Sequence, residues 1–75
     1  MNYKKGDKVT IRSYESMRDE YRVAISGEDE VLRNGFSIHM KYLCGNTYKI
    51  TYKNRGEYGI ADEIWRVNAS MFEEE

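Results

Sequence analysis

The sequence predicts a mainly β fold: a small barrel of about five strands, with a short helical excursion after the first strand and a single helical turn near the C-terminus. Two observations carry this prediction. Several short segments alternate polar and apolar residues, as strands do when one face is buried, and glycine-containing turn signals separate them. The 75-residue chain also has seven Tyr, two Phe and one Trp, large side chains that suit a chain too short to bury many residues.

The N-terminal part predicts a strand followed by a helix. Residues 8–12 alternate polar and apolar side chains after a Gly-Asp turn signal, which is typical of a half-buried strand. Ser13 is then a candidate N-cap for a short helix over residues 14–21. The large apolar residues of this helix recur at i, i+3 and i+7, so we expect them to form one stripe against the barrel. They are Tyr14, Met17 and Tyr21.

The middle of the chain is less regular. Residues 22–34 contain apolar alternation interrupted by an acidic tract, so a short irregular hairpin and an extended loop are both compatible with this segment. Asn34 and the glycine after it form a turn signal, and Ser37 is a candidate cap for one or two helical turns ending at Leu43. Gly45 is expected to end those turns in the left-handed conformation.

The C-terminal third predicts a meander of three strands. Residues 47–53 alternate strictly, so one set of side chains should face the core and the other should face water. The inward set is Tyr48, Ile50 and Tyr52, and the outward set is Thr47, Lys49, Thr51 and Lys53.

Two turns should join the strands of this meander. The Asn-Arg-Gly sequence at 54–56 suits a three-residue loop that ends with glycine at positive φ. The Asp-Glu pair at 62–63 is predicted to form a second tight turn. After the last strand, we expect Met71 and Phe72 to plug the barrel from a single helical turn, and residues 73–75 to form a frayed tail.

This order of elements is that of an SH3-like barrel, and residues 1–75 should form a single domain of that kind. The alternative is an OB-like barrel. That fold usually has longer strands and a helix between the third and fourth strands, and no helical pattern follows Leu43 until the end of this chain.

Three segments carry a resemblance to a known group of proteins: residues 6–17, 36–45 and 65–72. Together they resemble small uncharacterised SH3-like proteins encoded by bacteriophages and prophages. The resemblance covers most of the chain and implies a phage-type accessory protein with an SH3-like fold. It transfers no catalytic or binding residues.

Composition limits the class of protein. Twelve basic and thirteen acidic side chains give a net charge of −1, which argues against tight nonspecific binding to nucleic acid. Cys44 is the only cysteine, so no disulfide can form within the chain, and a reducing compartment is expected. No apolar run is long enough to cross a membrane. We therefore expect a cytoplasmic protein without membrane contact, monomeric or homodimeric, and the resemblance to phage-encoded proteins implies the cytoplasm of a bacterial host.

No reactive group is predicted. His39 and Cys44 are the only soft ligands and the only candidate nucleophile pair, whereas a metal site needs three or four ligands. The acidic tract at 28–30 lacks the alternating oxygen ligands of a calcium loop and is expected to be a solvated loop tip. The chain is thus predicted to be no enzyme and to use no cofactor or metal.

Two surfaces are candidates for binding. If the strands at 8–12 and 47–53 are neighbours, their outward side chains form a patch able to follow a phosphate backbone. This nucleic-acid-binding patch would consist of Lys8, Thr10, Arg12, Lys49, Thr51 and Lys53. Exposed tyrosines near arginine are typical of protein contact sites. The candidate protein-binding residues are Tyr14, Arg18, Tyr21 and Tyr42.

Each surface also has an ordinary explanation, namely solvated strand residues for the first and core or rim packing for the second. We expect a non-enzymatic binding module that a phage or mobile element uses to engage a host or phage protein, and that could inhibit a host function such as defence. The alternatives are a nucleic-acid-binding protein that uses its basic strand face and a structural, homodimeric phage assembly component.

Overall fold

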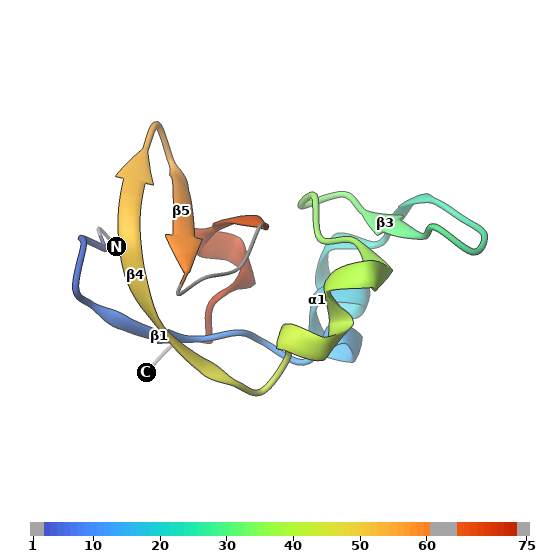
Figure 1. Cartoon of the computed structure of the whole chain (residues 1–75). Coiled ribbons are helices and arrows are strands. Elements are labelled where there is room, and N and C mark those ends of the chain that lie inside the picture. The colour runs from blue at the N-terminus through green and yellow to red at the C-terminus, as the bar shows by residue number, and fades with distance from the viewer. Residues whose placement is uncertain (1–2, 61–64, 74–75) are drawn as a thin grey trace.

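The computed structural model describes residues 3–60 and 65–73, and it is mainly β (Figure 1). Its largest element is an antiparallel sheet of four strands in the order β1-β4-β5-β6, curled into a half-barrel. The strands are β1 (Lys8–Thr10), β4 (Thr47–Asn54), β5 (Glu57–Ile60) and β6 (Arg66–Asn68). The mainly β prediction is confirmed. Instead of one barrel of about five strands, however, the chain forms this sheet and a separate sheet of two strands.

The chain after β6 returns to β1 and makes the sheet barrel-like. Ile11, directly after β1, forms an antiparallel bridge with Phe72. Beside it, the Arg12 N–H donates to the Met71 carbonyl at 2.9 Å. On the other side, the Ile11 carbonyl accepts from the Gly45 N–H at 2.8 Å. The segment that follows β1 is therefore hydrogen-bonded on one side to the C-terminal residues and on the other to the residues before β4.

The helical segments predicted over residues 14–21 and after Ser37 are confirmed. α1 (Tyr14–Tyr21) begins after Ser13, whose hydroxyl accepts from the Ser16 backbone N–H at 3.2 Å. η1 (Ile38–Leu43) is a 3-10 helix, and Ser37 caps it in the same way. Cap and apolar spacing are local signals, so the sequence alone located these elements well.

Residues 22–34 form an irregular hairpin, one of the two alternatives that the sequence left open. β2 (Val23–Ile25) pairs antiparallel with β3 (Val31–Leu32), and a bulge lies between Val23 and Ile25. Figure 1 shows the loop of this hairpin projecting from the side of the molecule that carries α1, away from β4 and β5. Leu32 anchors it, because its side chain is buried in the core.

A second bulge changes which residues of β4 face the core. Ile50 lies opposite Ile60, whereas Tyr52 lies opposite Gly59, so Thr51 is an extra residue in β4. Because each extra residue reverses the alternation, the prediction for Tyr48 and Ile50 is confirmed but that for Tyr52 is wrong.

Tyr52 lies on the outer face of the sheet, over Gly59. A Cβ atom built on Gly59 would come within 2.4 Å of the Tyr52 ring, so only glycine leaves room for the ring there. Arg66, opposite Gly59 on the next strand, places its guanidinium carbon 4.9 Å from the centre of the same ring.

The loop between β4 and β5 is shorter than predicted. Asn54 pairs directly with Glu57, which leaves two loop residues rather than three. Both have positive φ, 50° at Arg55 and 82° at Gly56, as a type I′ turn requires. The Asn-Arg-Gly sequence misled the prediction because its arginine occupies a position where asparagine or glycine is usual.

Asn34 connects the excursion to the C-terminal turn, η2 (Ala69–Met71). Its side-chain oxygen accepts from the Phe36 N–H at 3.1 Å, and its side-chain amide donates to the Ser70 hydroxyl at 3.2 Å. Its carbonyl accepts from the Asn68 side chain at 3.0 Å. Asn34 thus forms the turn that the sequence predicted and also links this turn to η2 by hydrogen bonds.

The C-terminal plug is present as predicted, because Met71 and Phe72 are both buried. Glu73, the first residue of the predicted frayed tail, is bonded instead: its N–H donates to the Thr10 carbonyl at 2.8 Å. Residues 74–75 and the predicted turn at 62–63 lie outside the described residues.

Candidate functional site

The basic patch predicted on the sheet is present only in part. β1 and β4 are neighbours, as that prediction required, and Lys8 lies directly opposite Lys49. Thr10 lies opposite Thr47, and their hydroxyl oxygens are 2.7 Å apart in a hydrogen bond. Lys8 and Lys49 are exposed, so two like charges share this part of the outer face.

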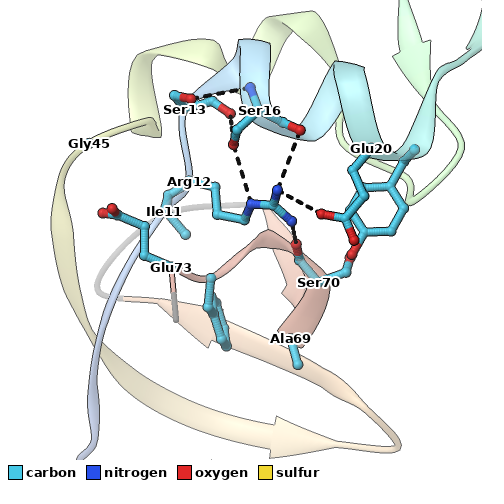
Figure 2. Close-up of a pocket in the computed structure, with 11 residues that line it drawn as sticks. Ile11, Arg12, Ser13, Ser16, Glu20, Gly45, Ala69, Ser70 and Glu73 are labelled. Atoms are coloured by element: carbon cyan, nitrogen blue, oxygen red, sulfur yellow. Dashed lines mark hydrogen bonds and ion pairs between the residues drawn. The ribbon is translucent and has the colours of Figure 1, made fainter. Parts of the chain in front are cut away.

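Arg12 does not belong to this patch, because its guanidinium is held between α1 and η2 (Figure 2). It donates to the Ser16 carbonyl at 3.3 Å and to the Ser70 carbonyl at 3.4 Å. The Glu20 carboxylate forms an ion pair with the Arg12 guanidinium at 2.8 Å. The groove of about 680 Å³ around it is therefore lined by a guanidinium that is neutralised and has most of its donors in use.

Lys53 also leaves the patch, as a consequence of the bulge at Thr51. It lies opposite the buried Tyr58, and cross-strand partners share a face of the sheet. Its Nζ atom is 5.8 Å from the centre of the Tyr58 ring. The outer face keeps Lys8, Thr10, Lys49 and Thr51 of the six predicted residues.

The predicted protein-binding residues do not form one surface. Tyr14 is buried, with 7% of its area exposed, and its hydroxyl donates to the Glu30 carboxylate. Burial, together with that carboxylate, raises the pKa of Tyr14 to about 12. Arg18 is exposed and approaches the same carboxylate at 3.5 Å. The expectation that Tyr14 offers its ring to a partner is wrong, because it packs in the core instead.

Tyr21 is half-buried and lines the same groove as Arg12. The Arg12 guanidinium carbon lies 5.6 Å from the centre of its ring, which packs against the core. Its ring is thus part of the contact that holds α1 to the barrel.

Tyr42 is the one predicted tyrosine whose side chain is exposed. It is 57% exposed, and its hydroxyl accepts from the Trp65 indole N–H at 2.8 Å. Asn46 donates from its side chain to the Tyr42 carbonyl at 2.9 Å and to the Tyr48 hydroxyl at 3.4 Å. These four residues, Tyr42, Asn46, Tyr48 and Trp65, are called the Tyr42–Trp65 surface below.

Sequence reasoning missed three of these four residues. Asn46 and Tyr48 follow Tyr42 within six positions, but Trp65 is distant in the sequence, so no local spacing brings it to the other three. One signal was available: Trp65 is the only tryptophan of the chain, and it stands beside a strand whose next inward position is Val67.

His39 and Cys44 are engaged separately. His39 Nε2 lies 2.6 Å from an Asp29 carboxylate oxygen, on the exposed hairpin loop. Cys44 is half-buried beside Tyr14 and Lys41, and burial raises the pKa of its thiol. Over residues 3–60 and 65–73, no group of three His, Cys, Asp or Glu side chains is placed to hold a metal ion.

Comparisons of the chain with protein-family models, curated proteins and solved structures give no match. In the part of the chain that the structure describes, no helix has the length and apolar character to span a membrane.

Proposed function

We propose that the protein is a non-enzymatic binding module with an SH3-like fold, and that it engages a protein partner through the Tyr42–Trp65 surface. The order of elements supports the fold assignment: a first strand, an excursion, three consecutive antiparallel strands, and a 3-10 turn before the final pairing with the first strand. An SH3-like fold alone implies no particular function, so the surface has to carry the functional part of the proposal.

The observation that carries it is the pair formed by the exposed Tyr42 and the half-buried Trp65. Tyrosine and tryptophan are enriched at protein contacts because each combines a large apolar ring with a polar group that tolerates water. The hydrogen bond between them orders two rings before any partner arrives, which lowers the entropic cost of binding.

This arrangement fits an extended or loop segment of a protein that offers an apolar side chain flanked by polar groups. The rings supply apolar contact area, and the Asn46 amide orders the polar groups beside them by donating to the Tyr42 carbonyl and the Tyr48 hydroxyl. The resemblance to phage-encoded proteins extends the proposal to its context: the partner is a host or phage protein, and binding could inhibit a host function such as defence.

The test uses the single tryptophan as a reporter. Tagged protein is used to capture partners from bacterial lysate, in parallel with Tyr42→Ser and Lys49→Glu variants. A captured protein is then purified and titrated while Trp65 emission is recorded. We expect retention by the wild type and by Lys49→Glu, loss with Tyr42→Ser, and a shift of Trp65 emission that saturates. A partner that binds Tyr42→Ser equally well would contradict the proposal.

A second candidate, nucleic-acid binding, is favoured by the Lys8–Lys49 pair. Like charges directly opposite each other on a sheet repel, and a phosphate group between them would relieve that repulsion. Binding of labelled DNA and RNA over a salt series tests this candidate. It requires affinity that falls steeply with salt and that weakens further with Lys49→Glu, whereas Tyr42→Ser should leave it unchanged.

A further inference from the structure

β2 presents an open edge at the side of the molecule. In the structure as described, β2 pairs with β3 and with no other strand. Two strands alone make a marginal sheet in water, and the outer edge of such a sheet offers free backbone donors and acceptors. The loop of this hairpin also projects away from the four-stranded sheet (Figure 1), which leaves room for another chain beside it.

β2 is short and bulged, but it lacks the side chains that most often protect an edge strand. Lysine, proline and inward-pointing charges keep natural edges from pairing with other chains. Residues 23–27 carry no charged side chain, and the whole chain has no proline. Ile25, at the end of β2, is 59% exposed, which is high for a large apolar side chain.

The charges that flank β2 are complementary to a second copy of the same strand. Arg22 precedes the strand and is exposed. Arg33 lies beside it, because the Arg33 backbone N–H donates to the Arg22 carbonyl at 3.0 Å. The other end leads to the exposed acids Glu28 and Asp29. An antiparallel arrangement of two such edges brings the basic end of each copy to the acidic end of the other, whereas a parallel arrangement opposes like charges.

Among the described residues, Arg22 and Glu28 take part in no ion pair, whereas Asp29 is bound to His39. Arg22 and Glu28, at the two ends of β2, are thus available to a partner chain, as is the exposed Arg33 beside Arg22.

We propose that two copies of this chain associate by antiparallel pairing of their β2 edges, with the exposed Ile25 side chains close to the twofold axis and the Arg22 end of each copy facing the loop that carries Glu28 of the other. The two small sheets become one sheet of four strands. A three-residue strand spans only about 10 Å, so the contact is small and the association weak and concentration-dependent.

Sedimentation velocity over a range from about 10 μM to about 1 mM tests the proposal. The mass should rise from 8.9 kDa for the monomer toward twice that value. Ile25→Lys should keep the protein monomeric throughout. Arg22→Glu should raise the dissociation constant roughly five- to thirtyfold, because twofold symmetry repeats the lost pair.

Arg22→Glu combined with Glu28→Arg should restore the affinity of the wild type. Lys5→Glu makes the same charge change near the N-terminus, beside β4, and should leave association intact. Because Ile25 and Arg22 are exposed, these variants should remain folded, which far-UV circular dichroism checks.

Amide exchange locates the interface independently. Residues of β2 should gain protection as concentration rises, while those of β5 should not. A wild-type mass that stays at the monomer value at about 1 mM would overturn the proposal. So would a dimer that Ile25→Lys leaves unchanged, since that dimer would use another surface.

Discussion

Single residues determine how the outer wall of the sheet is built, and Gly59 is the clearest example. Five of the six glycines have positive φ, as turns often require, but Gly59 does not. It is needed for space, because the Tyr52 ring lies where its Cβ would be. The bulge at Thr51 turns that ring outward, and Arg66 covers it.

Replacing Gly59 with alanine should therefore destabilise the protein by forcing the Tyr52 ring away. We expect Gly59→Ala to lower the free energy of unfolding by about 1–3 kcal/mol. Urea denaturation of a double-mutant cycle checks the cause: in a Tyr52→Ala background the added methyl group has room and should cost almost nothing. An equal cost in both backgrounds would show that the ring is not what Gly59 accommodates.

The ionisation of Tyr14 should make the folded state less stable at alkaline pH. Burial and the Glu30 carboxylate raise its pKa to about 12, from about 10 for an ordinary tyrosine. The folded state therefore holds this proton more tightly than the unfolded chain. The resulting stabilisation is complete below about pH 10 and is lost as pH rises through about 12.

The Tyr14→Phe variant cannot ionise at this position, so its pH profile is the control for the wild type. Near neutral pH the variant should be less stable by about 1–2 kcal/mol, because Glu30 loses a hydrogen-bond donor. Unfolding measured from about pH 9 to about pH 12 should show the wild type losing more stability than the variant, so that the difference between them shrinks. Parallel pH profiles would argue against a raised pKa at Tyr14.

At the scale of elements, the β4–β5 hairpin uses an unfavourable residue in its turn. Arg55 has φ of 50°, a left-handed conformation that asparagine and glycine adopt more readily. Arg55→Asn should therefore stabilise the protein by up to about 1 kcal/mol. Thermal unfolding should show a higher midpoint, with Lys53→Asn as a neighbouring control that leaves the turn unchanged. A lower midpoint for Arg55→Asn would mean that the arginine makes a contact that outweighs its strain.

The elements also show what could be predicted from the sequence. α1, η1 and the C-terminal plug were predictable because caps and apolar spacing lie within a few residues of one another, as at Ser13 and Ser37. The bulge at Thr51 was not, because polar and apolar residues keep alternating through it while the strand reverses its faces. The patch prediction failed at Lys53 for this reason.

The candidate site depended on longer-range contacts. Tyr42 was predicted as a contact residue, but Trp65 lies 23 positions away and meets it only in the folded chain. Arg12 looked like part of an outer stripe because no local pattern reveals that Glu20 and Ser70 hold its guanidinium. Pairing between distant segments decides both cases.

At the scale of the whole molecule, one core is shared by the four-stranded sheet and by the excursion, which contains the separate two-stranded sheet. Buried residues from both parts, such as Met17 and Leu32 on one side and Ile50 and Val67 on the other, form a single cluster. Arg12 and Asn34 add polar ties at its border. Neither part has a separate core of its own, so we expect them to unfold together.

Two probes can follow the two parts during urea denaturation. Far-UV circular dichroism reports mainly on α1 and η1, and Trp65 fluorescence reports on the sheet next to β6. The two transitions should coincide in the wild type. Arg12→Met removes the charge and keeps an apolar stem, but it leaves Glu20 free at the surface. It should lower the midpoint of both transitions equally, with a loss of about 1–3 kcal/mol. A helical signal that disappears before the Trp65 signal changes would show instead that the excursion is a separate folding unit, and that the shared core holds the two parts less firmly than its continuity suggests.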